Sequence, residues 1–227
     1  MDKTTIIIAQ FGRSDLTLNC VRSLTEHHPH LAEILIVDDG SGSPDVAPLQ
    51  SAQIERCTIL SRPVRSGVTS SWNFAARFAR GQMLVFLNND VITTGLWCDS
   101  LIDPLADNSC VMTGVERRPA VELSDSIREA WKIDSLLSGW CFAIRREFFA
   151  QLNGFDEKLQ LYFSDTDLQC RCLAQFGHGA IRTVENLPLQ HLGQQTTKDL
   201  PTRSQQWNDD RNHFERKWNC SPSKSSS

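Results

Sequence analysis

The 227-residue sequence lacks any apolar run that approaches the roughly 20 residues of a membrane-spanning helix. Its first residues lead into a short β-branched segment, which does not resemble the apolar region of a signal peptide. A basic stripe is absent too, because Lys and Arg are scattered and the formal net charge is -4, with a pI near 5.9. These absences argue against a transmembrane segment and against nucleic acid as a partner. They predict a cytoplasmic protein and leave a peripheral membrane contact open.

The eight cysteines lack the CxxC spacing of zinc and redox motifs. Most of them lie within apolar patterns, where cysteine packs as a small hydrophobic residue, so we expect buried, reduced thiols. The chain also lacks a composition shift or linker that would divide it. We therefore predict one domain over residues 1–218, followed by a disordered, serine-rich tail over residues 219–227.

Apolar segments alternate with segments of helical periodicity through the first ninety residues. Strands are predicted over residues 4–9, 33–37, 58–61 and 84–87, with helices that begin near Ser14 and near Thr69 or Ser70. Strands and helices that alternate at this spacing predict βαβ crossovers and a parallel sheet covered on both faces. The expected fold class is therefore α/β.

The second part of the chain shows weaker periodicity. Further strands are predicted over residues 110–113, 138–144 and 179–184, with helices over 96–105, 145–152, from about 164 to 177, and 204–218. Residues 190–193 are expected to form a loop. Residues 115–137 are rich in charge and irregular, which predicts either a functional loop that closes over a site or a surface insertion.

Polar side chains follow two of the predicted buried strands. Residues 84–87 run directly into Asn88, Asn89 and Asp90, and residues 33–37 run into Asp38 and Asp39. In an open α/β sheet, ligands bind at the carboxyl ends of the strands. A carboxylate at the end of residues 84–87 suits a divalent cation that carries a phosphorylated ligand. The structural alternative is an ordinary Asn/Asp turn.

A set of motifs in fixed order resembles the family 2 glycosyltransferases with the GT-A fold, and the bacterial rhamnosyltransferase-like members look most similar. The motifs are Val-Asp-Asp-Gly-Ser at 37–41, residues 67–73, Phe-Leu-Asn-Asn-Asp at 86–90, Gly-Phe-Asp-Glu at 154–157, Ser-Asp-Thr-Asp-Leu at 164–168 and His-Leu-Gly at 191–193. The resemblance extends over residues 4–218. It implies a Rossmann-like, mostly parallel central sheet with helices on both faces, a nucleotide-binding half over about 1–92 and an acceptor half over about 93–218.

The same resemblance implies the residues that bind the donor nucleotide and a metal ion. Asp39 would hold the base, since a carboxylate can accept the imide N–H of uracil or thymine. Trp72 stands where the family often has Arg or Asn, so either a cationic contact to the diphosphate is missing here or Arg65 supplies it. Asp90 and His191 would bind Mn²⁺ or Mg²⁺, although a lone loop histidine is usually a surface residue. The full implied donor set is Ala9, Gln10, Asp38, Asp39, Arg65, Asn73, Asn88 and Asn89.

For the acceptor side, the resemblance implies that Asp165 is the general base. Ser164 stands where the family has Glu. Gly139, Trp140, Asp156 and Asp167 would line the acceptor site. Two structural alternatives apply: Ser164 and Asp167 have the spacing of a capping box, and Trp140 can be a core residue.

The implied activity is an inverting, metal-dependent transfer of a hexosyl or deoxyhexosyl group. The donor would be a UDP- or dTDP-linked sugar, and the acceptor a glycan or a lipid-linked acceptor in cell-surface polysaccharide or glycoconjugate synthesis. A nucleotidyltransferase is one alternative, but residues 10–13 make a poor phosphate loop. A sugar-nucleotide-binding protein without catalysis is another, and Ser164, Asn88 and Trp72 favour it.

Overall fold

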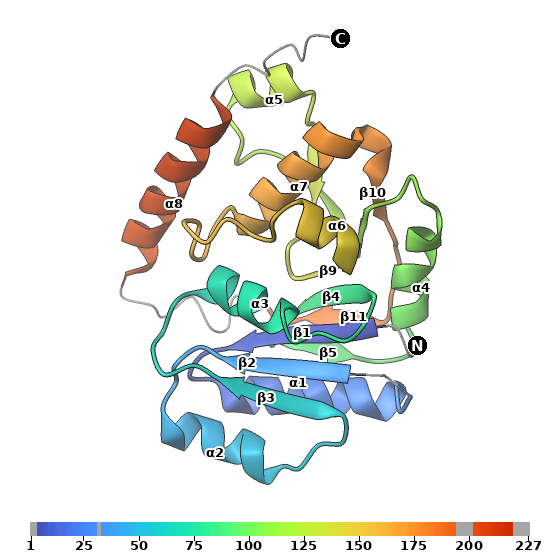
Figure 1. The fold of residues 1–227 in the computed structure, drawn as a ribbon, viewed down its shortest axis with the longest axis vertical. Helices are drawn as coiled ribbons and strands as arrows, with labels where there is room; N and C mark the ends of the chain where they lie inside the picture. The colour runs from blue at the N-terminus through green and yellow to red at the C-terminus, as the bar shows by residue number, and fades with distance from the viewer. Residues whose placement is uncertain (1–3, 31–32, 194–201, 220–227) are drawn as a thin grey trace.

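The computed structural model describes residues 4–30, 33–193 and 202–219, which build a mixed α/β fold around a seven-stranded sheet (Figure 1). The strand order is β10-β6-β9-β4-β1-β2-β3. All neighbouring strands are parallel except for β9, which runs antiparallel to both β4 and β6. The strands are β1 (Thr4–Gln10), β2 (Glu33–Asp38), β3 (Cys57–Ser61), β4 (Met83–Asn88), β6 (Met112–Gly114), β9 (Cys141–Arg145) and β10 (Ile181–Thr183). The predicted α/β class and mostly parallel sheet are confirmed.

The central strands are buried on both faces because alternate side chains enter two different cores. Ile6 and Ile8 of β1 pack into a cluster with Leu24 of helix α1 (Ser14–His27). Ile7 packs on the opposite face, in a cluster with Trp72 of α3 (Val68–Ala76). Side chains of a strand alternate between the two faces of the sheet, so one continuous apolar run serves both clusters.

Other helices complete the two layers. Helix α4 (Cys98–Ile102), continued by a 3-10 turn (Asp103–Ala106), covers the α1 face, whereas α6 (Arg146–Gln151) and α7 (Ser164–Phe176) cover the α3 face. A second 3-10 turn, His178–Ala180, leads into β10. Each described cysteine except Cys57 is buried, as the apolar patterns predict. No helix in the described parts of the chain has the length and apolar character needed to cross a membrane.

Helix α2 (Ser43–Ser51) was not predicted, because its two prolines hide the helical pattern. Pro44 lies in the first turn, where a missing N–H is tolerated, and Pro48 lies further inside. Val46 and Leu49 are the buried residues of this helix. Two apolar contacts thus hold a helix that local sequence preference disfavours.

Residues 115–137 are not an irregular loop, so that prediction is wrong. They form β7 (Arg117–Pro119), α5 (Asp125–Trp131) and β8 (Ser135–Leu137), with β7 and β8 paired as a small antiparallel sheet. Their apolar side chains make a third core with the loop before α7 and with helix α8 (Arg203–Trp218). The buried members include Ala120, Leu123, Ile127, Ile133, Leu136, Phe214 and Trp218. The segment is a packed layer, which does not support a lid.

The predicted loop over residues 190–193 begins instead as a strand. Strand β11 (Leu189–His191) pairs antiparallel with β5 (Val91–Thr93), and His191 lies opposite Val91. Apart from Asn219, the predicted tail lies outside the described residues.

Candidate active site

A cavity of about 510 Å³ opens at the carboxyl ends of β1, β2 and β4. Ligands of open α/β sheets bind at this edge. Strand β9 runs in the opposite direction, so Gly139, two residues before its first residue Cys141, reaches the same edge. The predicted site residues in the described lining are Ala9, Gln10, Asp39, Arg65, Asn88, Asn89, Asp90, Gly139, Asp165 and His191. Asp38, Asn73, Trp140, Asp156 and Asp167 lie outside it.

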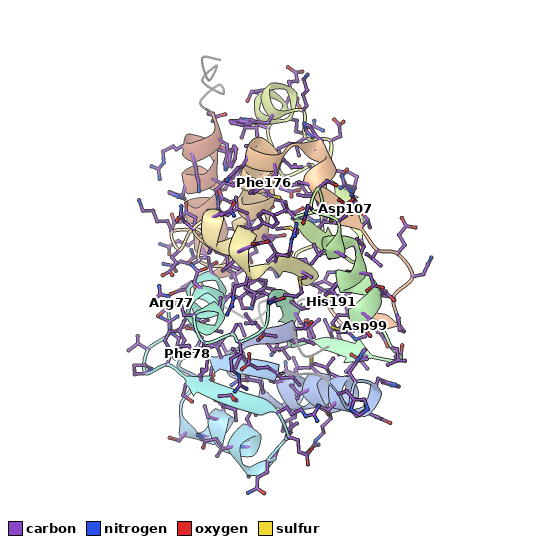
Figure 2. All side chains as sticks on the ribbon, turned by 45° about the vertical axis from the view of Figure 1, so that its right-hand side comes forward. Arg77, Phe78, Asp99, Asp107, Phe176 and His191 are labelled. Atoms are coloured by element: carbon purple, nitrogen blue, oxygen red, sulfur yellow. The ribbon has the colours of Figure 1, made fainter. Side chains whose placement is uncertain are left out.

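Asp90 and His191 are brought together by the pairing of β5 with β11. His191 Nε2 lies 3.1 Å from Asp90 Oδ1, and the backbone N–H of Leu192 donates to the Asp90 carbonyl. The Asn88 side-chain nitrogen lies 3.5 Å from the same imidazole nitrogen. Asp90 is nearly buried, with 4% of its side chain exposed, against 23% for His191. Figure 2 shows His191 near the middle of the molecule.

The Asp90 and His191 pair fits the divalent cation that the family resemblance implies. Two neighbouring ligands of an octahedral cation lie about 3 Å apart, close to the observed 3.1 Å. Among the described residues no group of three or more His, Cys, Asp or Glu side chains could hold a metal ion. The protein would therefore supply few ligands of low total charge, and a bound diphosphate would have to supply others.

Trp140 packs against the His191 imidazole and is not part of the described cavity lining. Its ring is stacked on the His191 imidazole, with centroids 5.0 Å apart and planes inclined by 16°. Its indole N–H donates to Glu116 Oε2 at 3.2 Å. Trp140 therefore orients the imidazole of His191, and its role in acceptor binding stays a prediction.

Asp165 lies in the first turn of α7 and faces the cavity, with 19% of its side chain exposed. A Cβ atom at position 139 would lie 2.3 Å from Asp165 Oδ2, so glycine is required there. Burial raises the pKa of Asp165 above its usual range, although the Arg118 charge partly opposes this. A carboxylate with raised proton affinity is better suited to act as a base.

The predicted capping box at the start of α7 is absent. Phe163 is the N-cap residue, in the left-handed region at φ 60°, and no side chain caps the helix. Asp167 is fully buried and binds helix partners instead. It accepts from Arg171 Nε at 2.7 Å and from the Trp218 indole at 2.9 Å, and it pairs with Lys217 at 2.8 Å. Its carboxylate therefore joins α7 to α8, and the predicted acceptor contact is not supported.

Asp156 is also held by α8. It accepts from Lys217 Nζ at 2.8 Å and lies 3.1 Å from His213 Nε2. Burial acts to raise the pKa of Asp156, but the hydrogen bonds from Lys217 and His213 outweigh it and leave the pKa well below its usual range. Like Asp167, Asp156 connects two parts of the fold.

Asn73 and Asp38 support the site from outside the cavity. Asn73 accepts from the backbone N–H of Phe155 and donates to its carbonyl, both at 2.9 Å, so it clamps the turn before α7. Asp38 accepts from Gln10 Nε2 at 2.7 Å and from the Ser41 backbone N–H at 3.2 Å. Asp38 thereby orients Gln10, which does line the cavity.

Asp39 holds the loop over residues 64–67 against the end of β2. Its carboxylate accepts from the backbone N–H groups of Ser66 at 2.9 Å and Gly67 at 2.8 Å, and from the Ser71 hydroxyl at 2.8 Å. Arg65, in the same loop, places its guanidinium 4.1 Å from the centre of the Phe11 ring. Phe11 and Arg65 both line the cavity, and a flat base could contact either surface.

Asp210 of α8 positions part of the cavity wall and was not predicted. It is buried and accepts from the backbone N–H groups of Gln160 at 3.1 Å, Leu161 at 3.0 Å and Tyr162 at 2.8 Å. All three residues line the cavity. Figure 1 shows α8 beside the loop that precedes α7. Only the burial of an Asp within a polar helix could have signalled this role, and local sequence does not reveal burial.

The chain matches the model of glycosyl transferase family 2 over residues 5–175. It is 27% identical over 237 residues to the O-antigen biosynthesis protein RfbC of Myxococcus xanthus. The aligned region covers 90% of this chain and 18% of that protein. The chain is 34% identical over 112 residues to polypeptide N-acetylgalactosaminyltransferase 4 of Caenorhabditis elegans, covering 48% and 19%. The chain thus spans about a fifth of the length of these curated relatives.

Solved structures share the fold. A mannosyltransferase from Pyrobaculum calidifontis in complex with GDP-Man and Mn²⁺ superposes with a TM-score of 0.60 at 19% identity, covering 82% of this chain and 55% of that one. Glucosyl-3-phosphoglycerate synthase from Mycobacterium tuberculosis, in complex with Mn²⁺, UDP-glucose and phosphoglyceric acid, gives 0.71 at 15% identity, covering 98% and 81%. The fold is GT-A, as the sequence motifs predicted. Because the family model also matches most of the chain, the chain belongs to glycosyl transferase family 2.

Proposed function

We propose that this chain transfers a hexosyl or deoxyhexosyl group from a nucleotide diphosphate sugar to an acceptor hydroxyl, with inversion at the anomeric carbon. The observation that carries the proposal is the convergence of Asp39, the Asp90 and His191 pair, and Asp165 on one cavity. Its volume of about 510 Å³ lies within the usual range of small-molecule sites. These groups supply a nucleotide contact, a cation site and a base.

The donor would lie along the ends of β1, β2 and β4. Asp39, Phe11 and Arg65 form the nucleotide end, and UDP- and dTDP-linked sugars both carry the imide N–H that a carboxylate can accept. Asp90 and His191 would hold Mn²⁺ or Mg²⁺ beside the diphosphate. A cation bound there would supply Lewis-acid stabilisation of the negative charge on the leaving diphosphate. The solved GT-A relatives, whose complexes include Mn²⁺ with UDP-glucose or GDP-Man, support this arrangement.

Asp165 would accept the proton of the acceptor hydroxyl. As that oxygen attacks the anomeric carbon from the face opposite the diphosphate, a new C–O bond forms and the bond to the diphosphate oxygen breaks. The proton remains on the Asp165 carboxyl, whose raised pKa favours its capture. One displacement of this kind inverts the anomeric configuration. Gly139 leaves the space that the carboxylate needs at the cavity wall.

A glycan or lipid-linked glycan is the proposed acceptor. The support is the relative from Myxococcus xanthus, whose name assigns it to O-antigen biosynthesis. This chain covers only part of that protein, so the acceptor class is proposed from the region that they share.

A sugar-nucleotide-binding protein without catalysis is the second candidate. Ser164 favours it, because this buried residue lines the cavity next to Asp165 where the family has a carboxylate. A further relative, 25% identical over 199 residues, is named a putative inactive polypeptide N-acetylgalactosaminyltransferase 11 of Drosophila melanogaster.

Transfer and donor hydrolysis, measured with Mn²⁺ over a panel of UDP-, dTDP- and GDP-sugars, separate the two candidates. Asp165→Asn should lower turnover on the order of 10²–10⁴-fold and leave donor affinity almost unchanged. Asp167→Asn is the matched control, because its buried carboxylate contacts α8, and it should mainly lower the thermal midpoint. If the wild-type chain binds the donor tightly but shows neither transfer nor hydrolysis, it is a binding protein without catalysis. Full turnover in Asp165→Asn would place the base elsewhere.

A further inference from the structure

Arg118 of β7 links residues 115–137 to Asp165. Its Nη1 atom donates to Glu122 Oε1 at 2.6 Å, whereas its Nη2 atom lies 3.6 Å from Asp165 Oδ2. Glu122 Oε1 also accepts from the hydroxyl of Thr166 at 3.3 Å. Thr166 directly follows Asp165, so Glu122 is anchored both to Arg118 and to the first turn of α7.

The two distances from the guanidinium differ in kind. The 2.6 Å contact with Glu122 is a short, charge-assisted hydrogen bond. The 3.6 Å separation from Asp165 exceeds hydrogen-bond length, so Arg118 acts on that carboxylate through charge alone. Arg118 is therefore hydrogen-bonded to Glu122, and it interacts with Asp165 only as a neighbouring charge.

We propose that Arg118 is a positioning residue for the transfer reaction, which holds the Asp165 carboxylate beside Gly139 while Glu122 keeps Arg118 out of a direct hydrogen bond with it. This inference rests on the proposed function of Asp165 as the base. A direct bidentate pair would occupy both carboxylate oxygens and stabilise the anion, which would weaken the base. Without any cation nearby, the buried group would hold its proton too firmly. The arrangement lies between these extremes.

The groups around Asp165 determine the direction of each substitution effect. Burial raises the pKa of Asp165, the Arg118 charge lowers it, and the Glu122 charge raises it. Removing Arg118 should therefore raise this pKa, and removing the charge of Glu122 should lower it. Further titratable groups that interact with these residues are Cys170 on α7, which faces Asp165, and Glu116, which faces Arg118. The same cavity is also lined by Asp39, Arg65, Asp90, Tyr162 and His191.

The test is a carbon NMR titration of the whole ligand-free chain, labelled with ¹³C at the Asp carboxyl groups. The Asp165 signal is identified by its loss in Asp165→Asn. In Arg118→Met, the titration midpoint of Asp165 should move up by about one pH unit or more. In Glu122→Gln, which keeps the shape of the side chain, it should move down, and Arg118→Lys should stay near wild type.

Arg117→Met is the matched control. Arg117 neighbours Arg118 on β7, but it contacts neutral oxygens, those of Thr183, Ser135 and Ile181. This variant should leave the Asp165 midpoint unchanged. If Arg118→Met does not fold, the downward shift in Glu122→Gln decides the matter alone.

An Asp165 midpoint that stays unchanged in Arg118→Met and Glu122→Gln, or moves the same way in both, would overturn the inference. The pH dependence of kcat provides a second readout. The pH at which kcat falls on the acid side of its profile should shift with the Asp165 midpoint in each variant. If Asp165→Asn keeps full turnover while the midpoints shift as stated, the proposed base is wrong and the pairing is right. If Asp165→Asn is inactive and the midpoints do not shift, the base stands and the role of Arg118 fails.

Discussion

The carboxylate of Asp39 accepts three hydrogen bonds within the protein, two from backbone N–H groups and one from a hydroxyl. An ionised carboxylate offers about four lone-pair sites, so one remains for a ligand. The two bonds from Ser66 and Gly67 also fix the loop that carries Arg65, which forms part of the cavity wall. Stability and the proposed donor binding would therefore be coupled at this single side chain.

Asp39→Ala should lose both properties together. Leaving Ser66 and Gly67 without their acceptor should lower the free energy of unfolding by roughly 2–4 kcal/mol. The loosened loop should also weaken UDP binding in the presence of Mn²⁺. Denaturant unfolding and calorimetric titration measure the two effects.

Asp38→Ala is the comparison for this prediction, because Asp38 is equally buried and hydrogen-bonded but lies outside the cavity lining. It should lose stability with a smaller effect on UDP affinity. An Asp39→Ala protein of normal stability that fails to bind UDP would mean that the carboxylate binds the uracil and does not stabilise the loop.

At the residue scale, the sequence motifs located the cavity residues better than their partners. Asp90, Asp165 and Gly139 stand at strand ends or helix starts, so the α/β pattern alone brings them to one edge. Asp156 and Asp167 belong to motifs of the same kind, yet they bind side chains of α8 some fifty to sixty residues further along. Nothing in the sequence around residues 156–167 reveals which side chains return from so far.

At the scale of single elements, the short pair β5 and β11 brings together the two residues of the proposed cation site. Only three residues of each strand are paired, but Asp90 immediately precedes β5 and His191 ends β11. The antiparallel register therefore fixes how far the imidazole lies from the carboxylate. Trp140, stacked on the ring, fixes its plane.

His191→Ala should weaken Mn²⁺ binding to the chain in the presence of UDP, because one of few protein ligands is lost. Calorimetric titration with Mn²⁺ gives the affinity without any need for turnover. His178→Ala, which removes an exposed histidine elsewhere, should bind Mn²⁺ as wild type does. Equal Mn²⁺ affinity in all three proteins would remove His191 from the cation site.

Helix α8 provides a second test at this scale, since its Asp210 carboxylate holds three consecutive backbone N–H groups of the cavity wall. Asp210→Ala should lower the free energy of unfolding by roughly 2–4 kcal/mol, because buried donors lose their acceptor. Amide hydrogen exchange should also rise at residues 160–162. The exposed neighbour Asp209→Ala is the control, and equal stability of the two variants would contradict the role of Asp210.

The elements that sequence predicted well are those whose pattern is set locally. Strands β1, β2 and β4 are continuous apolar runs, and α1 buries the face that its periodicity indicates. Helix α2 was missed because proline disfavours helix locally, whereas its burial is decided by distant contacts. Residues 115–137 were misread for a related reason. Their apolar side chains are spaced irregularly and meet a core that α8 completes.

At the scale of the whole molecule, the sheet separates two apolar layers. The cavity lies at the carboxyl ends of the strands, at the edge of the sheet. The α1 layer contains a buried titratable group, His28, which follows α1 directly. Its Nε2 atom accepts from the backbone N–H of Trp97 at 3.3 Å, and the two rings meet edge to face at 5.6 Å. His28 thus joins α1 to the start of α4. This packing requires the neutral imidazole, because Nε2 must be unprotonated to accept the hydrogen bond from Trp97.

This packing makes the stability of the molecule depend on pH. Burial lowers the pKa of His28, although the charge of Asp99 acts in the opposite direction. The unfolded chain, with an ordinary histidine pKa of about 6.5, therefore binds a proton more readily than the folded chain does. Stability should be fully present above about pH 6.5 and should fall as the pH drops below that value toward the lower folded pKa.

His28→Gln removes this titration, so its free energy of unfolding should decrease less than that of wild type between pH 7.5 and pH 5.5. Denaturant unfolding at both pH values measures the difference, and His30→Gln, which changes an exposed histidine, should keep the wild-type loss. If His28→Gln loses as much stability on acidification as wild type does, the acid sensitivity of the fold arises from other groups.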